Sequence, residues 1–131
     1  MSRTLEGLKI VSLGTSVAAP LCARFLADLG ADVIKVERPG TGDFARGWDE
    51  VLPGVSSAHL WCNSNKRSVT LNLKSNRGRE ALGRLVGGAD VFLENASPGV
   101  VARLGVDYAW AKGINPRIIY CHISGYGQDG P

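Results

Sequence analysis

The segment from Gly14 to Arg38 constrains the fold more than any other part of the chain. It follows a short apolar run at Leu8–Leu13 and has the sequence GTSVAAPLCARFLADLGADVIKVER. Small residues form a turn, Pro20 occupies the expected first position of a helix, and Gly30 is the expected stop. Val33–Val36 is a second apolar run, typical of a buried strand. The segment therefore predicts a strand–helix–strand unit with parallel strands and a right-handed crossover.

The large apolar side chains of this expected helix recur at the spacing of one helical face. They are Leu21, Cys22, Phe25, Leu26 and Leu29. Positions spaced in this way line one side of a helix, so we expect the stripe to pack against the sheet.

The alternation of strand and helix continues downstream. Three more strands are predicted over Ser68–Leu73, Asp90–Leu93 and Arg117–Ile123. The first of them alternates polar and apolar residues. A glycine-rich loop over 124–131 follows the last of them.

Three further helices are predicted, each opened by a capping residue. The first presents a face of Ala81, Leu82, Leu85 and Val86. The helices run from Ser75 to the Gly87-Gly88 stop, from Ser97 to Gly105 with Pro98 at the first helical position, and from Asp107 to about Lys112.

Between Arg38 and Arg67 the periodicity is weak and turn formers are frequent. Ser56–Cys62 can form a short helix there. An irregular stretch of about thirty residues inside a compact domain is more often functional or mobile than accidental.

These elements predict an α/β fold, with a Rossmann-like parallel sheet and flanking helices. The 131 residues correspond to one domain by length, and no linker, internal repeat or low-complexity segment divides them. The expected unit therefore covers residues 1–131.

Composition and charge argue against several classes of partner and site. The net charge of +3 argues against a nucleic-acid partner, because phosphate-backbone binders usually carry a dense basic stripe. No apolar run is long enough to span a membrane, and the N-terminus lacks an apolar signal region, so we expect a cytoplasmic protein. The cysteines, Cys22, Cys62 and Cys121, are far apart and form no CxxC motif, so no metal site is expected.

The turn from Gly14 to Pro20 is the first candidate site. A strand that leads into a helix N-terminus suits a phosphate or carboxylate, with the backbone of Ser16, Val17 and Ala18 lining the ligand. The alternative is an ordinary strand–helix turn. A dinucleotide fingerprint needs three glycines and only Gly14 is present, although Glu37 stands where a ribose-binding acid would.

Basic and amide side chains form the second and third candidates. A converging basic set would bind phosphates, and the alternative is scattered surface charge. Asn95 follows a strand and can bond an amide-bearing ligand or simply form a capping turn. His59 and His122 complete no recognisable triad. The basic set comprises Arg38, Lys66, Arg67, Lys74 and Arg103.

Taken together, five segments in this order resemble the N-terminal part of the class III CoA-transferase family, the CaiB/BaiF-like group that includes formyl-CoA transferase and α-methylacyl-CoA racemase. The segments cover nearly the whole chain. They are LEGLKIVSL, AAPLCARFLADLGADVIKVERPGTGDFARGW, NSNKRSVTLNLKSNRGREAL, ADVFLENASPGVVARLGVDY and NPRIIYCHISGYGQDGP.

The resemblance implies a CoA-binding large domain built from both ends of a longer chain, a separate small domain, and an interlocked homodimer. It implies CoA or acyl-CoA as a substrate, with no tightly bound cofactor. The residues at the matching positions, which the resemblance assigns to the CoA site, are Ser16, Val17, Ala18, Arg38, Leu71, Lys74, Asn95, Ala96 and Arg103.

The family transfers CoA from an acyl-CoA donor to a carboxylic acid through an aspartyl-CoA thioester. The resemblance places that aspartate beyond Pro131, so no catalytic residue is expected in this chain, which we expect to be inactive alone. Two alternatives remain open: a fragment of an α-methylacyl-CoA racemase, and a non-catalytic module that binds CoA or a nucleotide.

Overall fold

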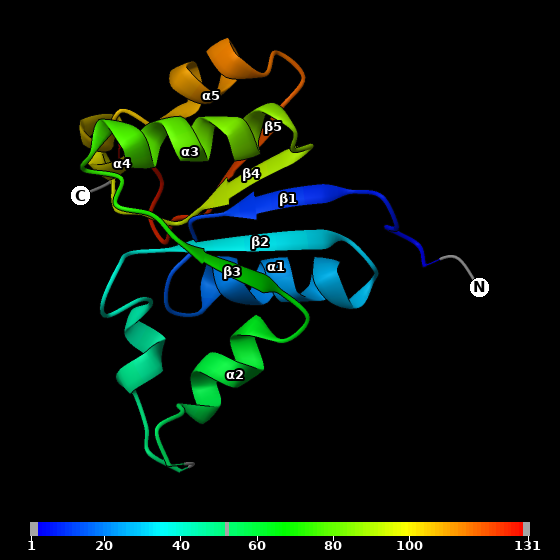
Figure 1. Cartoon of the computed structure of the whole chain (residues 1–131), viewed down its shortest axis with the longest axis vertical. Coiled ribbons are helices and arrows are strands. Elements are labelled where there is room, and N and C mark those ends of the chain that lie inside the picture. The colour runs from blue at the N-terminus through cyan, green and yellow to red at the C-terminus, as the bar shows by residue number, and fades with distance from the viewer. Residues whose placement is uncertain (1–2, 52, 130–131) are drawn as a thin grey trace.

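The computed structural model describes residues 3–51 and 53–129. A five-stranded parallel sheet of order β3-β2-β1-β4-β5 forms its centre (Figure 1). This confirms the predicted α/β, Rossmann-like architecture. The strands are β1 Lys9–Ser12, β2 Asp32–Glu37, β3 Arg67–Thr70, β4 Val91–Glu94 and β5 Ile119–His122.

Helices cover both faces of the sheet. The face below the sheet in Figure 1 carries α1 (Ala18–Asp28) and, beyond it, α2 (Ser57–Asn63). The opposite face carries α3 (Asn76–Gly87), α4 (Val100–Leu104) and α5 (Tyr108–Ile114). Alternate strand residues therefore enter two separate cores: Ile10 packs with α1, whereas Val11 packs with α3 and α5.

The packing face of α1 differs from the predicted stripe. Phe25 is 57% exposed and Leu29 is 49% exposed. The residues that pack on the sheet are Ala19, Ala23 and Ala27, four positions apart. Small side chains let the helix approach the sheet closely, so the alanine face is buried and most of the bulky stripe lies at its side.

Three element boundaries also differ from the prediction. Helix α1 begins two residues before Pro20, which is therefore its third residue. The third strand ends at Thr70, because residues 71–74 turn away toward Ser75. Pro98 does not start α4: Gly99 caps that helix with φ 76°, in the left-handed region that glycine tolerates.

The long irregular segment is ordered by two short elements. Phe44–Gly47 forms a 3₁₀-helix, η1, capped by Asp43, and α2 confirms the helix predicted near Ser56–Cys62. Asp49 ties the two together, since its carboxylate accepts hydrogen bonds from the backbone of Ser57 and Ala58.

The order of the strands decides where a ligand can bind. The chain adds strands outward from β1 on one side, through β2 to β3, and then returns to place β4 on the other side of β1. Open parallel sheets bind ligands at such a switch point, outside the carboxyl ends of the strands. Among the described residues, no helix has the length and hydropathy to cross a membrane.

Candidate functional site

A cleft of about 510 Å³ opens at the carboxyl ends of the strands from β1 to β4. Its walls are the turn after β1, the segments after β2 and β3, and the turn after β4 together with α4. Apolar side chains supply much of the lining: Leu13, Phe44, Leu71, Leu73, Val100, Val101 and Leu104.

Five of the predicted site residues line this single cleft. They are Arg38, Leu71, Lys74, Asn95 and Ala96, which come from three different segments of the chain. The structure therefore brings Arg38 and Lys74 to the same side of the sheet as Asn95. Whether these residues contact CoA stays a prediction.

The other four predicted residues lie beside the cleft rather than in its lining. Ser16, Val17 and Ala18 directly follow Thr15, which does line it. Arg103 belongs to α4, whose neighbouring residues face the cleft, and its guanidinium lies over Gly99. Their predicted CoA contacts also stay predictions.

Arg38 is exposed and held in a defined pose. Its guanidinium lies over the ring of Phe44, 4.4 Å from the centroid, and its Nε donates to the carbonyl of Gly42 at 2.9 Å. This leaves the two terminal nitrogens of the guanidinium available to bind an anion.

The turn after β1 is held by side chains from distant segments. Asn95 binds Thr15 twice, since its Oδ1 accepts from the Thr15 N–H at 2.9 Å and its Nδ2 donates to the Thr15 carbonyl at 3.0 Å. The amide of Asn95 thus joins the turns after β1 and β4. That it also bonds an amide-bearing ligand stays a prediction.

Lys35 and Asp43 form a buried ion pair below the same turn. The distance from Lys35 Nζ to Asp43 Oδ2 is 2.6 Å, and both residues are 2% exposed. Burial alone would raise the pKa of Asp43, but hydrogen bonds from Lys35 and from the backbone of Ser16 and Ala45 outweigh it, so the pKa lies below its ordinary value.

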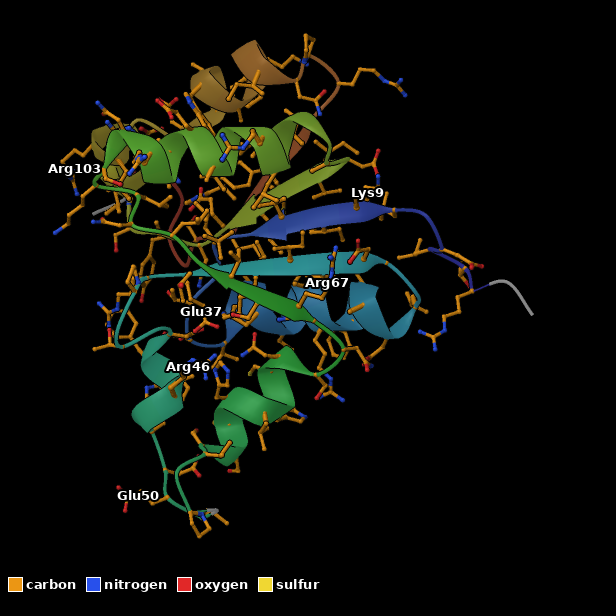
Figure 2. All side chains as sticks on the ribbon, in the orientation of Figure 1. Lys9, Glu37, Arg46, Glu50, Arg67 and Arg103 are labelled. Atoms are coloured by element: carbon orange, nitrogen blue, oxygen red, sulfur yellow. The ribbon has the colours of Figure 1, made fainter. Side chains whose placement is uncertain are left out.

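Glu37 is the second buried carboxylate (Figure 2). Arg46 grips it through two parallel hydrogen bonds of 2.7 and 2.8 Å, and Ser68 donates to it at 2.9 Å. The bond from Arg46 is the largest cause of a pKa lowered to about 2, against the opposing effect of burial. Because these partners occupy its oxygens, Glu37 does not serve as the ribose-binding acid that its position had suggested.

Two members of the basic set lie away from the cleft. Lys66 donates to the carbonyls of Pro20 and Cys62, and burial lowers its pKa to about 8. Arg67 opens β3 at the amino end of the sheet and pairs with Asp32 at 2.5 Å. For these two residues the structure therefore supports the alternative, in which the basic side chains do not converge.

The sequence did not predict one cluster of polar groups around Glu94. Glu94 is 1% exposed and binds the Tyr120 hydroxyl, the Nδ1 of His122 and the backbone N–H of Ala96.

His59 is also buried, and burial lowers its pKa. Across residues 3–51 and 53–129, no group of His, Cys, Asp or Glu could hold a metal ion.

Comparison with known proteins places this arrangement in a family. The model of CoA-transferase family III matches residues 5–131. The human succinyl-CoA:glutarate CoA-transferase is 45% identical over 98% of this chain and 30% of its own length. A formyl-CoA:oxalate CoA-transferase from Rhodopseudomonas palustris (strain HaA2) is 44% identical over 100% of this chain and 31% of its own length.

A solved structure agrees. A CAIB/BAIF family protein from Brucella suis superimposes with a TM-score of 0.93 and 43% identity, covering 100% of this chain and 36% of that one. The chain thus spans about 30% of the length of the curated relatives it matches. The family model covers nearly all of its residues, so the chain belongs to CoA-transferase family III.

Proposed function

We propose that this chain supplies the CoA-binding part of an enzyme that moves CoA from an acyl-CoA donor to a carboxylic acid. The observation that carries the proposal is the cleft at the switch point of the sheet, with Arg38 and Lys74 in its lining. The names of the related proteins, which are CoA-transferases, support transfer rather than racemisation.

The cleft is lined by both charged and apolar side chains, and CoA carries both phosphates and apolar groups. Arg38 offers a planar fork and Lys74 a point charge, and together they can neutralise the diphosphate and the 3′-phosphate. The apolar wall formed by Leu13, Val101 and Leu104 suits the adenine ring and the pantetheine chain, whose burial contributes affinity roughly in proportion to area.

In this proposal the residues of the cleft bind and orient CoA. In the proposed reaction an aspartate attacks the donor thioester and forms a mixed anhydride with release of the CoA thiolate. The thiolate then attacks the aspartyl carbonyl of the anhydride, which gives the aspartyl-CoA thioester and releases the donor acid as its carboxylate. The acceptor carboxylate attacks this thioester to form a second mixed anhydride and free CoA thiolate, and the thiolate takes up the acceptor acyl group and releases the aspartate. Holding the thiol near that aspartate is the task of the cleft.

Titration calorimetry with CoA, 3′-dephospho-CoA and NAD tests the ligand class. We expect CoA to bind more tightly than 3′-dephospho-CoA, because the extra phosphate would pair with Arg38 or Lys74. We expect no heat from NAD. Binding of NAD alone would refute the CoA assignment. Equal binding of the two CoA forms would leave the 3′-phosphate without a partner here and refute that contact.

A further inference from the structure

The buried pair of Lys35 and Asp43 reaches both walls of the cleft. On one side, Lys35 Nζ donates to the carbonyl of Gly14 at 2.7 Å and Asp43 Oδ1 accepts from the Ser16 N–H at 2.9 Å. On the other side, Asp43 Oδ1 accepts from the Ala45 N–H at 3.0 Å, at the start of η1. The charged groups are thus directed at each other and at backbone.

The turn after β1 needs this support. Ser16 adopts φ 63°, a left-handed conformation that costs a residue with a side chain about 1 kcal/mol or more. Asp43 holds the N–H of that same residue, and Asn95 holds Thr15 just before it. Without Asp43 the chain at Ser16 would be free to relax toward commoner backbone angles.

The opposite wall is also joined to residue 43 through the backbone. The Asp43 N–H donates to Glu37 Oε2 at 2.9 Å, and Arg46 clamps Glu37 from the far end of η1. The two residues that flank Asp43 supply the groups that hold the Arg38 guanidinium, namely the Gly42 carbonyl and the Phe44 ring. Displacing Asp43 would therefore move the support of Arg38 as well.

We propose that Asp43 is a positioning residue for the CoA site and that Lys35 is the counter-ion that allows its carboxylate to be buried. Asp43 sets the spacing between the turn at Gly14–Ser16 and the segment that supports Arg38, because its carboxylate accepts hydrogen bonds from both. The inference rests on the proposed function, because it concerns the same cleft. A buried ion pair adds little net stability compared with apolar residues of similar volume, so its role as a specific positioning device is testable separately from folding.

Two double variants separate positioning from stability. A single substitution would strand a buried charge and destabilise the fold, so both partners are changed together. Lys35→Met with Asp43→Leu removes the charges and the acceptor for Ser16. Lys35→Met with Asp43→Asn removes the charges but keeps a side-chain oxygen at the position of Oδ1. The two variants differ mainly in the hydrogen bonds to Ser16 and Ala45.

Titration of CoA into the wild-type chain and both variants, each shown to be folded by circular dichroism, gives the result. We expect the Leu variant to bind about tenfold more weakly than wild type, and the Asn variant to bind within about threefold of it. Equal affinity of the two variants overturns the proposal. Failure of the wild type to bind CoA refutes the proposed function instead, so the two failures are distinguishable.

A matched control and a second measurement complete the test. Arg67→Ala removes an ion pair at the amino end of the sheet and should leave CoA affinity unchanged. Amide hydrogen exchange of the wild-type chain reads the turn directly, even if a double variant fails to fold. We expect a protected Ser16 N–H, and exchange at the rate of an unstructured peptide would show that Asp43 does not hold the turn.

Discussion

Arg38 is the residue whose removal should affect the proposed ligand most directly. We expect Arg38→Ala to weaken CoA binding by about tenfold, since a charge-assisted hydrogen bond contributes roughly 1.5–3 kcal/mol and solvent screens part of it here. Arg38→Lys keeps the charge but loses the planar fork, so its affinity for CoA should lie between those of wild type and Arg38→Ala. Calorimetry at low and moderate salt provides the measurement.

The control is Lys9→Ala, which removes the same charge from the far end of the sheet (Figure 2). Its affinity for CoA should equal that of wild type once salt screens long-range effects. If Arg38→Ala binds CoA as tightly as wild type at low salt, the guanidinium does not contact a phosphate.

Glu37 makes stability depend on pH in a defined window. Its pKa is lowered from 4.5 to about 2, so its contribution is complete above about 4.5 and is lost as the pH falls toward 2. The loss should be about 2 kcal/mol, after allowing for the half-exposed Arg46. Denaturant unfolding at pH 7 and pH 2.5 measures it, and Glu37→Gln should show a smaller difference between the two pH values.

The sequence revealed the cleft residues more readily than the residues that hold them. Arg38 and Asn95 stand directly after predicted strands, which is where ligand residues of parallel sheets occur. Lys35 lies inside the apolar run VIKV. The position of its charged group could not be predicted without knowing which residue pairs with it. That partner, Asp43, belongs to an irregular segment whose path no periodicity predicts.

Helix α3 offers a prediction at the scale of the element, because Gly78 packs against the loop that lines the cleft. A Cβ at Gly78 would lie 2.0 Å from the carbonyl oxygen of Asn72, a backbone atom that cannot move alone. We expect Gly78→Ala to lower the free energy of unfolding by about 1–3 kcal/mol, the usual cost of overpacking. Thermal and denaturant unfolding provide the measurement.

Gly113, inside α5, is the matched control. A Cβ there meets no atom within 4 Å, so Gly113→Ala should raise the free energy of unfolding by about 0.5–1 kcal/mol through helix propensity. Equal effects of the two alanines would contradict the close approach of α3 to residue 72.

The elements themselves were largely predictable, whereas the way they pack was less so. Of the predicted capping residues, Ser75 and Asp107 do start helices, since a side-chain oxygen next to free backbone N–H groups acts locally, whereas Gly99 rather than Ser97 caps α4. The buried face of α1 depends instead on how near the helix can come to the sheet. The spacing of Ala19, Ala23 and Ala27 therefore decides which face is buried, whereas the spacing of the large side chains predicts a different face.

At the scale of the whole molecule, one edge of the sheet is apolar and open. In the described part of the chain β5 pairs only with β4, and Ile119 is 61% exposed. Its register with Val91 directs it to the α1 face, beside the half-buried Cys121. Unpaired strand edges with apolar side chains promote association between chains.

We therefore expect this chain to self-associate as its concentration rises, and Ile119→Lys to reduce that association. A lysine at an edge strand disfavours pairing with another edge, and an exposed position tolerates it without loss of the monomer's stability. Sedimentation velocity over a range of concentrations measures the effect. Val51→Lys, at an apolar and more exposed position between η1 and α2, should leave association unchanged, since Val51 belongs to no strand. Equal effects of the two lysines would show that general apolar exposure, and not the β5 edge, drives the chains together.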